Sequence, residues 1–322
     1  MFKMSLDAIA SVIKGELIGC GEAECAGFST DSREVQQNAL FIALAGDNHD
    51  GHEYVADAIS RGAVAAMVER PIDGCDAIQI VVPSVRDALL QLSAYWRKQF
   101  HPLTIAVTGS CGKTSVRELL QSIFALAQNT LASVKSYNNA LGVPSTLLTL
   151  SDLHKFYVQE IGANHAGEIL PLVRAVQPDI AIITNVAAAH LEGFGSLQGV
   201  ATAKGELLAG LSAEGVAVLN RDDVFFDYWL SLLEGKRHVS FSLSQVADVM
   251  AKAISINSTG CADFILCSSH GEFKVQLQVI GRHQVANALA AAAAGLAAEL
   301  PMSLIVAGLE AAQGEERRLQ QY

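Results

Sequence analysis

A six-residue segment of this chain has the residue types and the spacing of a phosphate-binding loop: Gly109-Ser110-Cys111-Gly112-Lys113-Thr114. Its glycines allow the backbone to curl so that several N–H groups point at one anion. The start of the following helix adds a positive end, worth about 0.3–1 kcal/mol per charge. Lys113 can reach the outer phosphates of a nucleotide, and the Thr114 hydroxyl can bind Mg²⁺. The segment therefore predicts a nucleotide site.

The spacing of this loop differs from the common G-x-x-x-x-G-K-[ST] form, because Val107 occupies the place of the first glycine. A plain glycine turn between a strand and a helix is the alternative interpretation. The apolar strand predicted before the loop, the helix predicted after it and the second glycine together favour the nucleotide site. A nucleophilic role for Cys111 is disfavoured, because the loop needs only the backbone at that position.

Three further residues follow predicted strands and could complete a divalent metal site. Glu160 ends the strand in "VQEIGANHAGEI", His190 follows the next strand in "TNVAAAHLEGFGS", and Lys204 lies on the helix that contains "ATAKGELL". Open α/β sheets place their ligands at the carboxyl ends of parallel strands. Mg²⁺ prefers oxygen ligands, so Thr114, Glu160 and the nucleotide phosphates make a chemically sensible site. Taken singly, His190 reads as an ordinary loop or core histidine and Lys204 as a solvated helix residue.

The elements that must position these residues are predicted from hydrophobic periodicity. Residues 5–14 read as a helix with apolar positions at Leu6, Ile9, Ala10 and Ile13. Strands are predicted within 39–46, 63–69 and 77–82, with a helix over 53–62 between the first two. Ser84 caps a helix that ends before His101-Pro102, a natural domain boundary.

After Pro102 the pattern changes to buried strands that alternate with helices. The strands fall at 103–109, 155–162, 178–186 and 215–220, and the helices at about 113–128, 167–176, 196–211 and 223–234. This alternation predicts a mostly parallel sheet that is covered on both faces. Short antiparallel strands are expected over 248–280, and helices over 283–300 and 303–312. The fold class is therefore α/β, with a small first domain, a P-loop domain and a short antiparallel extension.

Composition excludes several classes of protein. Hydrophobic residues make up 51% and charged residues 17% of the 322 residues, which disfavours disorder. The formal charge of −11 disfavours non-specific binding to nucleic acid, which needs a basic surface. Apolar runs are short and interrupted, so we expect no membrane span and no secretory signal. The six cysteines lack C-x-x-C spacing, which predicts free thiols rather than a zinc site or a disulfide framework.

Several long segments resemble one family, the Mur ligases of peptidoglycan synthesis. "FSTDSREVQQNALFIALAGDNHDGHEYVADAISRGAVAAMVE" is similar to the family's uridine-nucleotide domain, "VTGSCGKTS" to its phosphate loop and "GRHQVANALAAAAA" to its G-x-H-N-x-x-N helix. "SYNNALGVPSTLL", "EIGANHAGEI" and "NVAAAHLEGFGSLQGVATAKGE" resemble the branch that adds D-alanyl-D-alanine. The resemblance covers nearly the whole chain.

This resemblance implies a role for each matching residue. Catalytic roles fall to Lys113, Glu160, His190 and Lys204, and the metal ligands would be Thr114, Glu160, His190 and Lys204. ATP binding falls to Thr108, Gly109, Ser110, Cys111, Gly112, Lys113, Thr114, Ser115 and Asn287. Binding of the UDP substrate falls to Ser29, Thr30, Asp31, Ser32, Arg33, Asp50, Gly51, His52, Asn138 and Asn139. Arg33 suits a diphosphate, because a guanidinium can fork onto phosphate oxygens.

Lys204 matches the lysine that is carbamylated in the family. A free ammonium about 4 Å from a divalent ion would cost roughly 8 kcal/mol at an effective dielectric of 20. Addition of CO₂ converts this cation into a carboxylate that can bind or orient a second Mg²⁺ beside His190.

The resemblance implies an ATP-dependent amide ligase that joins D-Ala-D-Ala to UDP-MurNAc-tripeptide through an acyl phosphate, with Mg²⁺ as cofactor. We expect a cytoplasmic monomer with residues 1–101 as the UDP-substrate domain and 102–313 as the ATP domain. Residues 314–322 would begin a linker to a third domain that the sequence lacks. The third residue of the peptide, diaminopimelate or lysine, stays open.

The chain departs from the family pattern in two places. Gln284 stands where asparagine is usual, and Arg317 stands where glycine precedes the family's arginine, here Arg318. The alternatives are the diaminopimelate- or lysine-adding Mur ligase, folylpolyglutamate synthase, and a catalytically silent module that binds a UDP substrate or a nucleotide. The uridine-type first domain disfavours the folate enzyme.

Overall fold

The computed structural model describes residues 2–46, 49–134, 137–188 and 191–313, and it divides into two compact units. The first unit comprises Met1–Phe100 and Pro144–Ser151, and the second comprises His101–Val143 and Asp152–Tyr322. Each unit is therefore built from two separate stretches of chain. The two arginines in the terminal departure from the family pattern, Arg317 and Arg318, lie outside the described residues.

The first unit contains a small sheet in which four strands run parallel. The strand order is β2 (Glu16–Ile18), β7 (Ile78–Val81), β6 (Ala65–Val68), β5 (Leu40–Ile42) and β4 (Phe28–Ser29), and β2 alone is antiparallel to its neighbour. A separate antiparallel pair joins β1 (Lys3–Ser5) to β3 (Glu24–Ala26). The strands predicted within 39–46, 63–69 and 77–82 are confirmed as β5, β6 and β7.

The helices of the first unit follow from local sequence signals. They are α1 (Leu6–Ile13), α2 (Val55–Ser60) and α3 (Val85–Arg97), with short 3₁₀ turns η1 (Ser32–Glu34) and η2 (Gly51–Tyr54). The predicted first helix is confirmed, and its four predicted apolar positions are all buried. Ser84 caps α3 as predicted, because its hydroxyl accepts the Asp87 N–H at 3.2 Å.

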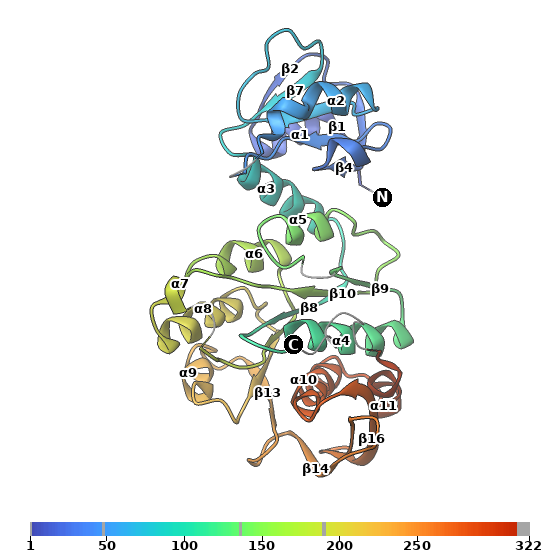
Figure 1. The fold of residues 1–322 in the computed structure, drawn as a ribbon, viewed down its shortest axis with the longest axis vertical. Coiled ribbons are helices and arrows are strands. Elements are labelled where there is room, and N and C mark those ends of the chain that lie inside the picture. The colour runs from blue at the N-terminus through green and yellow to red at the C-terminus, as the bar shows by residue number, and fades with distance from the viewer. Residues whose placement is uncertain (1, 47–48, 135–136, 189–190, 314–322) are drawn as a thin grey trace. The chain divides into compact units, whose positions relative to one another are not determined.

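The second unit is built on a larger sheet (Figure 1). Among the described residues nine strands follow in the order β16 (Gly271–Ile280), β15 (Cys261–Ser268), β14 (Val249–Ile256), β13 (Arg237–Ser242), β12 (Val216–Asn220), β11 (Ile180–Ile183), β8 (Leu103–Thr108), β10 (Phe156–Glu160) and β9 (Thr130–Ala132). All neighbours from β14 to β9 pair in parallel, and β14, β15 and β16 pair antiparallel. The predicted α/β fold with an antiparallel extension is confirmed. β9 and β13 were not predicted.

Helices cover both faces of this sheet. They are α4 (Lys113–Ala127), α6 (Ile169–Val176), α7 (Leu191–Phe194), α8 (Leu197–Ala209), α9 (Phe226–Ser231), α10 (His283–Ala297) and α11 (Met302–Ala311), while α5 (Gly142–Leu147) spans the boundary between units. Successive residues of β8, such as Ile105, Ala106 and Val107, are all buried, so both faces are covered as predicted. α4, α10 and α11 pack together, and α6 packs with α8 (Figure 1).

Small residues allow the helices of the second unit to approach closely. The alanines at 288 and 290–294 of α10 are fully buried in the main core, and Gly308 of α11 lies against Ile123 of α4. A Cβ at position 308 would lie 2.4 Å from the Cα of Ile123. This packing fixes α4, and with it the loop that precedes α4.

Each unit contains one of the two tryptophans. Trp96 packs edge-on against Phe2 and Phe100, and its indole N–H donates to the Leu150 carbonyl at 3.1 Å. Trp229 is fully buried in α9 and donates to the Ala201 carbonyl at 3.0 Å. None of the helices in the described part of the chain has the length and apolar character needed to cross a membrane.

Candidate active site

The phosphate loop connects β8 to α4 in the conformation that its two glycines permit. Gly109 has φ 149° and Gly112 has φ 82°, both in the region that favours glycine. A Cβ at position 109 would lie 1.9 Å from the Thr184 hydroxyl oxygen, and one at 112 would lie 2.3 Å from Asn287 Oδ1. Because α4 begins directly after Gly112, the positive end of this helix lies at the loop.

The ammonium group of Lys113 folds back over the loop. Its Nζ donates to the Gly109 carbonyl at 2.8 Å and to the Ser110 carbonyl at 3.4 Å. After burial, the positive charge of Lys113 is the second cause that lowers the pKa of Lys204, so the two predicted catalytic lysines interact electrostatically.

Two residues that the sequence analysis did not single out hold the loop from the end of β11. The Thr184 hydroxyl donates to the Cys111 carbonyl at 2.7 Å, and Asn185 contacts both Ser110 and Cys111. The sequence signal that could have found them is their position directly after a buried parallel strand.

A cavity of about 660 Å³ lies beside the loop within the second unit. Residues on its wall include Gly112, Thr114, Ser115, Gly281, Gln284 and Asn287. The Asn287 side chain donates to Gln284 Oε1 at 2.8 Å, and Gln284 Nε2 lies 3.5 Å from the Ser115 hydroxyl. Gln284, the departure from the family pattern, therefore bridges α10 and α4. A cavity of this size beside a phosphate loop can hold the nucleoside end of a nucleotide.

Glu160 carries an unpartnered buried oxygen. The residue is 1% exposed, and Asn138 Nδ2 donates to Oε1 at 2.7 Å, whereas Oε2 has no hydrogen-bond partner. The hydroxyl oxygen of Thr108, at the end of β8, is likewise buried without a partner. A buried carboxylate oxygen is costly unless a donor or a cation meets it. Glu160 Oε2 therefore fits a hard divalent cation.

Few other described side chains are placed to bind such a cation together with Glu160. Within the described ranges, no three His, Cys, Asp or Glu side chains are grouped so that they could hold a metal ion. Thr114 is 8% exposed at the start of α4 and can supply its hydroxyl. His190, predicted as a ligand, lies outside the described residues. The described oxygen donors near the loop are therefore the Thr114 hydroxyl and the Glu160 carboxylate.

Lys204 is buried in the middle of α8, with 3% exposure. Its Nζ lies 5.3 Å from the centre of the Phe194 ring, within cation–π distance. Burial, and after it the positive charge of Lys113, lower the pKa of Lys204 to about 8. A lysine with this pKa holds a useful fraction of neutral amine near neutral pH, and the neutral amine is the form that adds CO₂.

The predicted UDP-substrate residues of the first unit lie at the carboxyl ends of its parallel strands. Ser29 ends β4 and leads into η1, and Asp50 caps η2 after β5. This edge is where an open parallel sheet binds ligands. Asn138 and Asn139 instead belong to the second unit, where Asn139 Oδ1 accepts the N–H groups of Leu141 and Gly142.

Arg33 is already paired with a carboxylate of its own turn. Its Nε and Nη2 donate to Asp31 over 2.6–3.2 Å, and this holds the pKa of Asp31 at about 2. The Ser29 hydroxyl donates to the Asp31 carbonyl at 2.8 Å. Thr30 is exposed and Ser32 is buried. The guanidinium is 79% exposed, so a phosphate can reach it from solvent.

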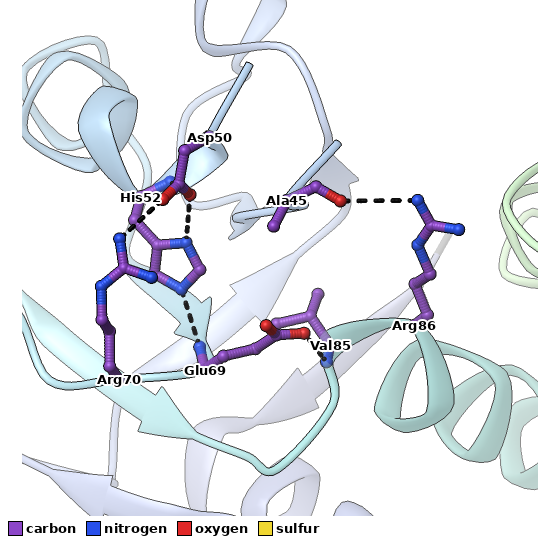
Figure 2. A network of polar contacts seen from close by, with 7 residues as sticks. All are labelled: Ala45, Asp50, His52, Glu69, Arg70, Val85 and Arg86. Atoms are coloured by element: carbon purple, nitrogen blue, oxygen red, sulfur yellow. Dashed lines mark hydrogen bonds and ion pairs between the residues drawn. The ribbon is translucent and has the colours of Figure 1, made fainter. Parts of the chain in front are cut away.

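Asp50 and His52 form a network that fixes the neighbouring strand end (Figure 2). His52 Nε2 accepts the Glu69 N–H at 2.8 Å, so the ring proton lies on Nδ1 and is donated to Asp50 at 2.5 Å. Arg70 donates to the other Asp50 oxygen at 2.6 Å. Arg70 and the His52 donors hold the pKa of Asp50 well below its usual range. Gly51 is needed here, because a Cβ would lie 2.6 Å from the Leu44 nitrogen.

Two arginines at this edge were missed by sequence reasoning. Arg70 follows β6, and Arg86 lies in the first turn of α3 with its guanidinium directed toward the Ala45 carbonyl at 3.4 Å (Figure 2). Neither lies in a motif, and only the place of Arg70 shortly after a strand and that of Arg86 at a helix start could have marked them.

Comparisons of the sequence and of the fold with known proteins match the chain to one family. Residues 107–295 match the model of the Mur ligase middle domain, and residues 24–97 match the Mur ligase family catalytic domain. The chain is 39% identical to the UDP-N-acetylmuramoyl-tripeptide--D-alanyl-D-alanine ligases of Haemophilus influenzae and Escherichia coli, and each match covers 96% of this chain and 68% of the relative. A crystal structure of MurF from Acinetobacter baumannii superposes with a TM-score of 0.93 at 37% identity, and covers 98% of this chain and 70% of that one. The chain belongs to the Mur ligase family.

Proposed function

We propose that this chain carries out ATP-dependent amide formation between D-Ala-D-Ala and UDP-MurNAc-tripeptide. The observation that carries the proposal is the 39% identity, over 96% of the chain, to relatives that bear the name of this activity. The phosphate loop, the adjoining cavity and the orphaned Glu160 oxygen supply the chemistry that such a ligase needs.

The reaction has two steps. A terminal carboxylate oxygen of the tripeptide attacks the γ-phosphorus of ATP, and ADP leaves to give an acyl phosphate. The amine of D-Ala-D-Ala then attacks the acyl carbon, loses a proton, and inorganic phosphate leaves. Lys113 and the loop amides neutralise the phosphate charge, and no side-chain nucleophile is required. Cys111 and Asn287 would line the nucleotide, together with the other predicted loop residues from Thr108 to Ser115.

We propose that Mg²⁺ is held by Thr114 and Glu160. When bound, Mg²⁺ would neutralise charge on the phosphate oxygens. The fit rests on Glu160 Oε2, which is buried and without a partner, while Asn138 fixes the other oxygen of the same carboxylate. Asn138 would thus orient a metal ligand. Our sequence-based expectation that Asn138 and Asn139 meet the substrate stays a prediction.

We further propose that Lys204 is carbamylated. Its neutral amine attacks the carbon of CO₂, the N–C bond forms as one C–O π bond opens, and the adduct releases one N–H proton to solvent to leave the carbamate. The product carries a negative charge where a free ammonium would repel both Lys113 and a metal ion. His190 would stand beside this carbamate as a second metal ligand.

The first unit would bind the UDP end of the substrate at its strand ends, through Ser29 to Arg33 and Asp50 to His52. Exposed ion pairs are weak because water screens them, so the Arg33–Asp31 pair can open to a phosphate at little cost. We expect the protein to act as a monomer in the cytoplasm, where both nucleotides are available. No step above needs a second copy of the chain or a nucleic acid.

The test is phosphate release from ATP. Release should require both UDP-MurNAc-tripeptide and D-Ala-D-Ala, measured with this chain and with this chain joined to the part of a relative that the match does not cover. Calorimetric titration should separately show binding of ADP and of UDP-MurNAc-tripeptide. Binding of both ligands without any dependent phosphate release would identify a silent binding module, and binding of neither would overturn the proposal.

A further inference from the structure

We propose that Asn185 is a positioning residue of the phosphate loop. It holds the first half of the loop, Ser110 and Cys111, and so leaves the phosphates to the second half, Gly112 to Thr114. The inference rests on the proposed nucleotide site and adds to it a residue and a division of labour within the loop.

The contacts of Asn185 are bidentate and specific. Its side-chain Oδ1 accepts the Cys111 N–H at 3.0 Å, and its Nδ2 donates to the Cys111 carbonyl at 3.2 Å. One carboxamide therefore grips both polar groups of a single residue, as a neighbouring β-strand would. The backbone carbonyl of Asn185 accepts the Ser110 N–H at 3.0 Å.

We call the hydrogen bonds of Asn185 and Thr184 to the loop the clamp. Both residues lie at the end of a buried strand. Thr184 donates its hydroxyl to the Cys111 carbonyl at 2.7 Å, and its own N–H donates to the Thr108 carbonyl at 3.0 Å. Asn220, at the end of β12, donates to the Thr184 carbonyl at 2.9 Å. Three adjacent parallel strands thus support one loop that contains two glycines. A loop that is ordered before binding loses less entropy when the nucleotide arrives.

The clamp also decides which amides face the ligand. Because the N–H groups of Ser110 and Cys111 donate to Asn185, they already have hydrogen-bond partners within the chain. The N–H groups of Gly112 to Thr114 belong to the start of α4, where the helix end favours anions. The pyrophosphate of a nucleotide is therefore met by the helix start and by Lys113.

The first test compares Asn185→Ala with Gln79→Ala by titration with ADP. Gln79 is a matched control, because its side chain grips both polar groups of Ile72, at 2.9 and 3.2 Å, in the first unit. We expect Asn185→Ala to weaken ADP binding by about tenfold or more, the effect of a misplaced binding group. Gln79→Ala should leave ADP affinity within about twofold, although it removes the same kind of bond. Equal ADP affinity in wild type and Asn185→Ala would overturn the proposal.

The second test uses the wild type alone, first without and then with ADP, so it does not depend on the folding of a variant. Amide hydrogen exchange of the ligand-free wild type, followed by NMR, should show Ser110 and Cys111 protected. Addition of ADP should add protection at Gly112 to Thr114 only. If the Cys111 amide hydrogen exchanges as fast as that of an unstructured loop, Asn185 does not hold Cys111 and the proposal is wrong. If Cys111 is protected but ADP does not bind, the clamp stands and the proposed nucleotide site fails.

Discussion

Lys204 illustrates how an environment prepares one side chain for chemistry. An ordinary lysine has a pKa near 10.4 and is almost fully protonated at neutral pH. Burial in α8 and the charge of Lys113 lower the pKa of Lys204 to about 8. At pH 7 about one amine in ten is then neutral, against about one in several thousand for an exposed lysine. Carbamylation, as proposed above, would replace this buried cation by an anion.

Carbamylation of Lys204 should depend on pH with a definite sign. Because only the neutral amine adds CO₂, the carbamylated fraction at fixed dissolved CO₂ should rise as pH increases through about 8. The ¹³C signal of a carbamate in protein equilibrated with labelled bicarbonate measures this fraction. Lys204→Met is the control and should show no signal, whereas an exposed residue such as Lys252 should not contribute near pH 8. A signal that does not change between pH 6.5 and 8.5 would argue against the lowered pKa.

Removal of the Lys204 side chain should abolish ligation, and a small carboxylate should restore part of the activity. We expect Lys204→Ala to lose activity that bicarbonate does not restore, because no amine remains. Acetate or formate should restore part of it by placing a carboxylate in the space left behind. Phosphate release measures the rescue, and absence of any rescue with normal Mg²⁺ affinity would contradict the carbamate.

Lys113 should matter for turnover more than for folding. Its Nζ lies over the loop and carries the charge that meets the γ-phosphate in the proposed reaction. We expect Lys113→Ala to reduce turnover by about 10² or more, as loss of an oxyanion donor does. Lys252→Ala removes a lysine that is 57% exposed and paired with Glu272, and it should leave turnover unchanged. Near-normal ligation by Lys113→Ala would refute the role.

At the scale of elements, the phosphate loop needs glycine at position 109 for two reasons: the positive φ and the lack of room for a Cβ. Gly109 and Gly74 both have positive φ, at 149° and 72°, but only Gly109 is crowded, by Thr184. We expect Gly109→Ala to destabilise the second unit by about 1–3 kcal/mol and to impair ADP binding. Gly74→Ala meets no atom within 4 Å and should cost less, without effect on ADP. Denaturant unfolding measures the loss of stability of both variants, and ADP titration measures their affinity. Equal effects of the two substitutions would contradict the prediction.

The elements that bear the site were predictable where a pattern is local. The strand before the loop, α4, α8 and the Ser84 cap all follow from periodicity and capping. β13 was missed because "RHVSFS" begins with polar residues and only its last three are fully buried. The Asn185 clamp could not be read from the sequence, because Asn185 and Cys111 are 74 residues apart and meet only through the order of strands.

The ion pair between Arg33 and Asp31 likewise could not be predicted from the sequence. The resemblance implies that Arg33 meets a diphosphate, but the turn η1 brings Arg33 onto Asp31. Which partner a guanidinium takes depends on turn geometry, and residue types do not determine that geometry. The motif located the strand end correctly and left the contacts undetermined.

For the molecule as a whole, the two units have separate hydrophobic cores. We therefore expect a ligand that binds one unit to raise the stability of that unit alone. The core of the first unit gathers around Phe41 and Val55, and that of the second around β8, α4 and α10. ADP at 100 times its Kd should add about 2.7 kcal/mol to the second unit. Scanning calorimetry should therefore show one component moving to higher temperature with ADP while the other stays. A scan in which ADP moves neither component would contradict the nucleotide site.

The placement of the two tryptophans turns each unit into its own optical reporter. Trp96 packs edge-on against two phenylalanines in the first unit, and Trp229 lies between α8 and α9 in the second. Replacement of either indole by phenylalanine would leave an intrinsic fluorophore that senses one unit alone. The Trp229 indole contacts Ala201 and lies beside Gly205, the neighbour of Lys204 in α8, so its emission would record events around the buried amine without any added dye.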